Sequence, residues 1–216
     1  IDTYGADAVR LFILSDSPPE KDVQWSEEGI ISAHKFIQKL WSLNLMIKDE
    51  INKDHSEDEN NELTKFTNRF IKKVTDALNN FSYNVIIAYI HELYSFLYKV
   101  IKNKYKKQTL LSNYHKILIV IMPIVPHLSN ECIKLLNVKT EVKWPNIDKK
   151  FLIEDYSNIV VQINGKKRGL LRTEKNINED KIIQMINKDK KIFKYIDGNQ
   201  IKKKIFIPNR LINIII

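Results

Sequence analysis

The sequence contains a single cysteine, five glycines and no long apolar run. Because Cys132 cannot form a disulfide within the chain, a reducing compartment is favoured. No apolar stretch approaches the roughly 20 residues that a membrane-spanning helix needs, and no basic-then-apolar secretory signal opens the sequence. We therefore expect a cytoplasmic protein without a membrane partner. The chain also begins at Ile1 rather than at methionine, so we expect a piece of a longer protein.

Motifs for catalysis and cofactor binding are absent as well. The phosphate-cradling GxxxxGK pattern does not occur, since Gly165 and Lys166 have no glycine at the required distance upstream, and GxGxxG does not occur either. The five histidines show no HExxH spacing, and there is no CxxC pair. His127, directly after Pro126, is expected to cap or pack a helix start. We therefore expect no catalytic residue, no cofactor-binding residue and no metal ligand in this chain.

Positive charge exceeds negative charge, and the excess is unevenly distributed. The formal net charge is +9, from 35 Lys and Arg against 26 Asp and Glu. Residues 151–216 hold 14 Lys and Arg and 7 Asp and Glu, a net +7, whereas residues 1–150 hold 21 and 19, a net +2. Such a concentration predicts a polyanionic partner. The alternative is that a generally lysine-rich composition, with 30 Lys and 5 Arg, puts lysine on every surface.

Apolar residues in the first 150 positions recur with the 3.6-residue period of helices that bury one face. We expect a short helix over residues 5–14 that ends before Pro18 and Pro19, because proline cannot continue it. Further helices are expected over about 27–45, 63–78, 83–104, 110–122 and 126–136, with a polar loop over 48–61. Ser26 is a candidate N-cap for the second of these helices. The pattern predicts a helical bundle.

After Trp144 and Pro145 the pattern changes to the alternation typical of strands. Residues 158–164 alternate, the Asn164–Gly165 pair predicts a tight type I′ turn, and residues 168–173 return as a second strand. A helical stretch over 178–195, which can be two short helices, precedes strands over 201–207 and 211–216. We therefore predict an α+β fold, with a helical bundle in residues 1–150 and a small ββααββ domain in residues 151–216. The hinge is expected near 146–157.

Cations are expected to gather on the sheet of this tail domain. Strand alternation places Arg168, Leu170 and Arg172 on one face. Lys166 and Lys167 add charge at the hairpin tip, where folding does not require it. We predict that a nucleic-acid backbone binds through seven residues: Lys166, Lys167, Arg168, Arg172, Lys202, Lys203 and Lys204. The alternative for the last three is protection of an edge strand against pairing with another chain.

Several segments resemble leucyl-tRNA synthetases of the bacterial type. Residues 3–41 (TYGADAVRLFILSDSPPEKDVQWSEEGIISAHKFIQKLW) resemble the passage that leads from the catalytic domain of that family into its helical domain. Residues 123–131 (PIVPHLSNE) and 144–145 (WP) resemble parts of that helical domain. Residues 160–168 (VVQINGKKR) match a tail motif, Val-Val-Gln-Val-Asn-Gly-Lys-x-Arg, with Ile163 in place of the third valine, and residues 202–216 resemble the closing run. The tail motifs are more specific to leucyl enzymes than the first block, which valyl, isoleucyl and methionyl enzymes share in part.

The resemblance implies that the parent protein is a class I leucine–tRNA ligase that uses ATP and magnesium. The first ~20 residues would continue from its catalytic domain, and the catalytic signatures would lie outside this chain. What remains would be the tRNA-binding portion, monomeric and without a cofactor of its own. The helical domain would follow the inner side of tRNA(Leu), and the tail would reach the corner formed by the D and T loops, recognising folded RNA by shape.

Three alternatives are open at this point. The first is a free-standing RNA-binding module with no synthetase attached. The second is a protein-interaction bundle whose basic tail only keeps it soluble. The third is the equivalent region of a valyl- or isoleucyl-tRNA synthetase.

Overall fold

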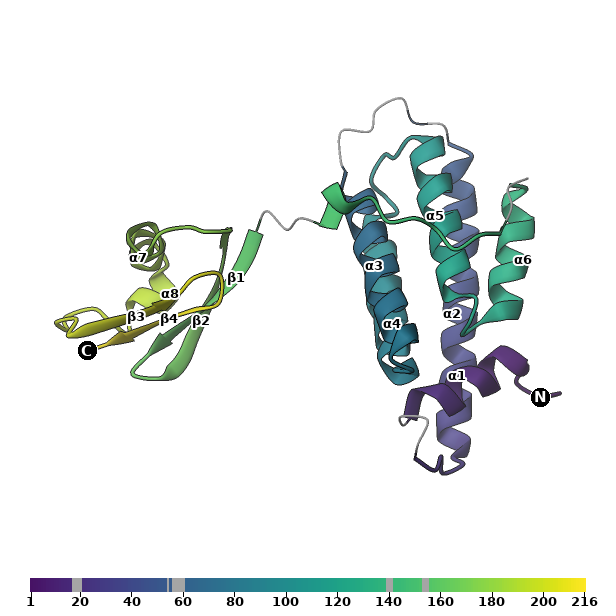
Figure 1. Ribbon diagram of the computed structural model, residues 1–216, viewed down its shortest axis with the longest axis horizontal. Coiled ribbons are helices and arrows are strands. Elements are labelled where there is room, and N and C mark those ends of the chain that lie inside the picture. The colour runs from purple at the N-terminus through teal and green to yellow at the C-terminus, as the bar shows by residue number, and fades with distance from the viewer. Residues whose placement is uncertain (17–20, 54, 56–60, 139–141, 153–155) are drawn as a thin grey trace. The chain divides into compact units, whose positions relative to one another are not determined.

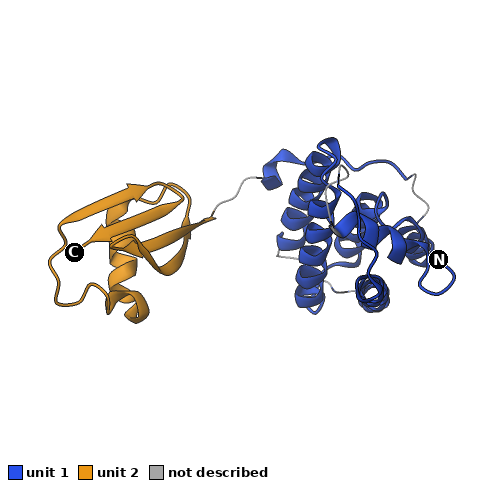
Figure 2. Cartoon of the chain, turned by 90° about the horizontal axis from the view of Figure 1, so that it is seen from below, with its two compact units in different colours: residues 1–152 blue, residues 153–216 orange. Residues whose placement is uncertain are grey.

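The computed structural model describes residues 1–16, 21–53, 55, 61–138, 142–152 and 156–216 (Figure 1). The chain divides into two compact units, Ile1–Leu152 and Ile153–Ile216, which are described separately (Figure 2). Within the described ranges, no helix combines the length and the apolar character that a bilayer crossing requires.

The first unit is built from helices. Its elements are α1 (Ala6–Asp16), α2 (Glu27–Ile51), α3 (Glu62–Asn79), α4 (Tyr83–Val100), α5 (Lys107–Ile121), α6 (Pro126–Leu136) and the short 3-10 helix η1 (Lys149–Leu152). Helices α2 to α6 run up and down beside one another, and α1 lies across one end of them (Figure 1). The predicted helical bundle is confirmed.

Two predicted helix ends were wrong. Helix α2 continues to Ile51, beyond the expected end near residue 45, because Ile47 and Ile51 keep the helical period and are buried. The expected loop over 48–61 is therefore shorter, and residues 54 and 56–60 lie outside the described part of the chain. Helix α4 ends at Val100 instead of residue 104, and residues 101–106 form a turn and an extended link.

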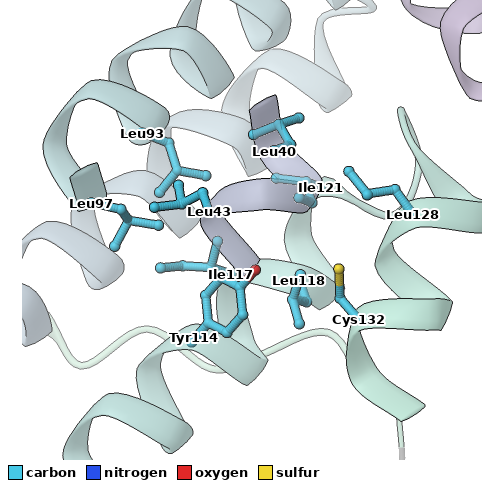
Figure 3. Close-up of a pocket in the computed structure, with 10 residues that line it drawn as sticks. All are labelled: Leu40, Leu43, Leu93, Leu97, Tyr114, Ile117, Leu118, Ile121, Leu128 and Cys132. Carbon is cyan, nitrogen blue, oxygen red and sulfur yellow. The ribbon is translucent and has the colours of Figure 1, made fainter. Parts of the chain in front are cut away.

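The core of the bundle is apolar and closely filled. Leu40, Leu43, Leu93 and Leu97 meet residues of α5 and α6 around a cavity of about 20 Å³, which has room for roughly one water molecule (Figure 3). Cys132 lines this cavity at 1% exposure, as expected for a small buried hydrophobe. Burial raises the pKa of its thiol to about 12.

Helix α1 stabilises the junction between α5 and α6 through two charged side chains. The carboxylate of Asp7, 5% exposed, accepts hydrogen bonds from the backbone N–H groups of His127 (3.3 Å) and Leu128 (2.7 Å) at the start of α6. The Nδ1 atom of the His127 ring lies 2.9 Å from Oδ1 of the same carboxylate. One turn along α1, Arg10 donates to the carbonyls of Pro123 and Ile124. The expected structural role of His127 is thus observed, with a carboxylate from α1 as the cap.

The segment that follows α6 is attached to α3. The indole N–H of Trp144 donates to Thr75 Oγ1 at 3.1 Å, and the backbone N–H of Asp148 donates to Asn68 Oδ1 at 2.8 Å. These contacts hold the stretch before η1 against the bundle. Of the expected hinge at 146–157, residues 153–155 lie outside the described residues.

The described part of the second unit holds a four-stranded sheet. Its strands are β1 (Tyr156–Ile163), β2 (Lys166–Glu174), β3 (Lys203–Ile207) and β4 (Leu211–Ile215), in the order β2-β1-β4-β3. The β1–β2 and β3–β4 pairs are antiparallel, and the central β1–β4 pair is parallel. Helices α7 (Glu179–Lys188) and α8 (Lys190–Phe193) cover one face through a core rich in isoleucine. The predicted ββααββ order is confirmed.

A β-bulge interrupts the β1–β2 ladder. Val161 pairs with Gly169 and Gln162 pairs with Lys167, so Arg168 is the extra residue on β2. Gly169 faces α8 so closely that a Cβ there would lie 2.3 Å from Ile192 Cδ1 and 2.7 Å from Cγ1. The absence of a side chain at this position lets α8 pack on the sheet.

Replacing Asp7 should destabilise the bundle. In Asp7→Ala, two buried or half-buried N–H groups lose their acceptor, and we expect the free energy of unfolding to fall by about 2 kcal/mol. Urea denaturation followed by helical circular dichroism measures the change. Asp2→Ala, at an exposed carboxylate two residues from the chain start, is the matched control. Equal stability of the Asp7→Ala variant and wild type would show that the α6 start does not depend on this contact.

Because α8 packs on Gly169, substitutions at Gly169 and Ile192 should have non-additive effects on stability. Gly169→Ala should destabilise the second unit by roughly 1–3 kcal/mol through steric overlap, and Ile192→Ala by about 2–4 kcal/mol through lost packing. The double variant should lose less than the sum, since truncating Ile192 makes room for the added methyl group. Amide hydrogen exchange in β1 and β4, followed by NMR in the whole chain, reports the opening free energy. Additive losses would contradict the contact.

Candidate nucleic-acid interface

The sheet brings two cationic segments, far apart in the sequence, to the same end. Lys166 pairs with Ile163, Ile163 with Ile214, and Ile214 with Lys204, so one row crosses all four strands. Three inter-strand steps of about 4.8 Å put the two lysines roughly 14 Å apart across this row. The start of β2 and the start of β3, which carry these cations, therefore lie at the same end of the sheet (Figure 1).

The hairpin tip is held in place by the C-terminal strand. Asn164 and Gly165 have positive φ values of 49° and 77°, as a type I′ turn requires. The Asn164 backbone N–H donates to the Ile214 carbonyl (2.9 Å), and its side-chain oxygen accepts from Ile216 (3.1 Å). The Gly165 N–H donates to Asn213 Oδ1 at 3.0 Å. The tip is thus a fixed platform for the lysines that follow it.

The strand pairing decides which face each cation occupies. Lys167 and Lys203 pair with Gln162 and Ile215 on the face opposite α7 and α8, here called the uncovered face, and Arg172 joins them there opposite Asn158. Lys166 and Lys204 instead share the face of the buried Ile163 and Ile214, at its two edges. All are exposed to solvent. The uncovered face also carries exposed apolar side chains, namely Leu170, Ile205 and Ile207.

The expectation that Arg168 shares a face with Arg172 was wrong. The bulge places Arg168 outside the alternation, and its guanidinium lies over the ring of Tyr195, 4.2 Å from the centroid, on the side of the helices. Arg172 lies over the ring of Tyr156 at 5.2 Å. Such contacts orient a guanidinium while leaving its N–H groups able to bind an anion.

The remaining cations differ in their surroundings. Lys204 forms an ion pair with Glu179 in the first turn of α7, at 3.4 Å, so part of its charge is already compensated. Lys202 precedes β3, and its backbone N–H donates to Ile215 at 2.8 Å. Among the described residues, the side chains of Lys166, Lys167, Lys202 and Lys203 form no ion pair. The charges of these four lysines are therefore not used by the fold.

One cation of this surface was missed by the sequence reasoning. Lys194 reaches the same Tyr195 ring as Arg168, at 5.0 Å, and so adds a cation beside the bulge. The available signal was the lysine-rich run over residues 188–194. That run was assigned only to a helix, because nothing in the sequence indicated that its end lies beside β2.

The arrangement is suited to binding phosphate and sugar. Long cationic side chains on a rigid edge can follow a polyanionic backbone and displace its counterions, which makes binding strongly salt-dependent. Backbone contacts of this kind position a nucleic acid without reading its sequence. We find no three His, Cys, Asp or Glu side chains grouped for a metal ion in the described residues.

The bundle also holds a pocket of about 450 Å³. It lies between α1, α2 and α6 and is lined by residues that include Tyr4, Trp41 and Glu131. Asp7 and His127 also line it, but they are occupied with each other and with the start of α6. These two polar groups of the pocket therefore serve the fold.

Comparison with known proteins agrees with these observations. The family described as "Anticodon-binding domain of tRNA ligase" matches residues 60–186. The chain is 36% identical over 218 residues to a leucine–tRNA ligase of Zymomonas mobilis, covering 100% of this chain and 25% of that protein. It is 37% identical over 220 residues to the leucine–tRNA ligase of Orientia tsutsugamushi, covering 99% of this chain and 25% of that protein. The chain thus spans about a quarter of the length of these curated relatives.

A solved structure shows the same fold. It is the ternary complex of Agrobacterium radiobacter agnB2 LeuRS with tRNA and LeuAMS, with a TM-score of 0.77 and 23% sequence identity. The match covers 98% of this chain and 29% of that chain. Bundle, sheet and family match agree, and the chain belongs to the family of anticodon-binding domains of tRNA ligases.

Proposed function

We propose that this chain is the tRNA-holding portion of a leucine–tRNA ligase, monomeric and cytoplasmic. In this role it positions tRNA(Leu) for leucylation by a class I catalytic domain that uses ATP and magnesium. The observation that carries the proposal is the joint placement of the two cationic segments at one sheet end. The curated relatives are leucine–tRNA ligases along the whole chain, which favours the leucyl enzyme over a valyl or isoleucyl one.

The surface supports a grip on folded RNA rather than on a particular sequence. Lys166 and Lys204 stand at opposite edges of one row, so they can meet phosphates that are separated by more than one nucleotide. Arg168 and Arg172, oriented by tyrosine rings, offer planar donors to phosphate or ribose. The exposed apolar side chains on the face of Arg172 suit the outer corner of tRNA, where the D and T loops meet. Recognition by shape is usual for folded RNA.

Binding energy gained here acts on catalysis by positioning. A contact far from the reacting atoms raises the effective concentration of the tRNA 3′ end at the catalytic centre. It should not change the reaction between leucine and ATP, because tRNA takes no part in that step. We call Lys166, Lys167 and Lys203 the sheet-end cations. Their loss should therefore slow leucyl transfer and leave adenylate formation unchanged.

The sheet-end cations can be tested in the 216-residue chain. Fluorescence anisotropy measures its binding to labelled tRNA(Leu) at several salt concentrations. In the variant Lys166→Gln, Lys167→Gln, Lys203→Gln, we expect binding to weaken roughly tenfold or more at about 0.1 M salt, with the slope of log K against log salt reduced by roughly two. In the intact ligase, the same changes should lower aminoacylation and leave leucine-dependent ATP–pyrophosphate exchange intact.

A matched control separates position from net charge. Lys181→Gln, Lys188→Gln, Lys190→Gln removes the same charge from the exposed helical layer of the same unit. It should bind tRNA within about twofold of wild type. If this control weakened binding as much as the sheet-end variant did, the sheet end would not be the binding site. A parallel fall in pyrophosphate exchange would rule out the positioning role.

A further inference from the structure

We propose that the bundle holds a second RNA-backbone contact, at the link between α4 and α5. This lysine loop consists of Lys99, Lys102, Lys104, Lys106 and Lys107. The inference rests on the proposed function, since it assumes that the chain binds tRNA. It adds a site on the first compact unit, whereas the sheet-end cations belong to the second.

The lysine loop carries charge without compensation. No aspartate or glutamate occurs in the sequence between Glu92 and Glu131, and all five lysines are exposed. In the described part of the chain none of the five forms an ion pair. Some lysines elsewhere on the bundle are paired, such as Lys72 with Asp76 and Lys73 with Glu92. The loop is therefore a concentrated positive surface on a unit whose other charges nearly balance.

The backbone of the loop is fixed by buried anchors. Ile101, Tyr105 and Leu110 are only 3%, 2% and 2% exposed, and they alternate with the lysines. The Asn103 N–H donates to the Val100 carbonyl, and the Tyr105 N–H donates to the Asn103 carbonyl, both at 2.9 Å. A loop held in this way presents its charges in a defined arrangement, which lowers the entropy lost on binding.

Folding does not account for Lys106 and Lys107. They stand at the start of α5, where the helix dipole disfavours cations, and no side chain caps this end. Two other helices of the chain follow the opposite rule. Helix α2 begins with Ser26 as N-cap and two glutamates, and α7 begins with Asn178 as N-cap followed by Glu179 and Asp180. Lysines at an unfavourable position indicate a role in binding.

An aromatic pair beside the loop favours RNA as the partner. Tyr98 is 55% exposed and lies in the last turn of α4, four residues before Lys102. Its ring stacks with the ring of Tyr94 at a centroid distance of 5.9 Å. Exposed rings next to cations can stack on bases or riboses while the lysines bind phosphates. An acidic protein would use the charge but would have less use for the rings.

The test compares tRNA binding by the 216-residue chain and its variants. In Lys104→Gln, Lys106→Gln, Lys107→Gln, we expect roughly tenfold weaker binding at about 0.1 M salt, and a salt slope reduced by roughly two. The control Lys21→Gln, Lys72→Gln, Lys134→Gln removes the same charge from exposed positions elsewhere on the bundle and should bind like wild type. Circular dichroism confirms that each variant is folded.

A second readout locates the contact on the RNA. An iron chelate attached at Lys104→Cys should cleave tRNA at nucleotides different from those cleaved by one at Lys167→Cys. The native Cys132 does not interfere, because it is 1% exposed and its pKa is raised to about 12 by burial. No cleavage from Lys104→Cys, with cleavage from Lys167→Cys, would overturn the inference.

The outcomes separate this inference from the proposed function. If the lysine-loop variant bound tRNA like wild type while the sheet-end variant bound weakly, the second contact would be wrong and the proposed function would stand. If the lysine-loop variant lost affinity for polyglutamate but not for tRNA, the loop would be a surface for acidic proteins, and the inference would fall. If the wild-type chain did not bind tRNA at all, both would fall.

Discussion

The parallel pairing of β1 with β4 is the contact on which the candidate interface depends. Each of these strands has an antiparallel neighbour, so the direction of the central pair decides where the starts of β2 and β3 lie. With β1 and β4 parallel, both starts reach the same end of the sheet. An antiparallel central pair would place them at opposite ends, and Lys166 and Lys204 could not share a row. Hydrogen bonds from Asn164 and Gly165 to β4 hold the hairpin tip to this arrangement.

The chain uses its charged side chains in two different ways. On the bundle, Asp7 and Arg10 form hydrogen bonds with backbone groups near the start of α6, and their charges stabilise the fold. At the sheet end and in the lysine loop, cations are exposed and mostly lack acidic neighbours. Charges that do not stabilise the fold are available to a polyanion, and their mutual repulsion is relieved when phosphates bind.

Local signals in the sequence predicted much of the fold and part of the interface. The helical period identified the bundle, and Asn164–Gly165 identified the hairpin, because that turn needs positive φ at both positions. Cap signals worked where the cap is local, as at Ser26, whose hydroxyl accepts from the Gly29 N–H at 3.2 Å. The end of α2 was placed too early because residues 48–50 of its last turn are charged and only Ile51 there is apolar. Arg168 was assigned to the wrong face because a bulge leaves no clear local signature.

The sequence by itself determined the element types, the hairpin turn and the concentration of positive charge after residue 150, since each depends on neighbours within a few positions. Only the tertiary structure decided that Asp7 caps a helix about 120 residues away, that Arg168 turns toward Tyr195, and that the two cationic segments meet at one end of the sheet. These arrangements depend on strand direction, a bulge and the packing of distant helices. Each is set by the fit of the whole core, so no local pattern of residues can specify it.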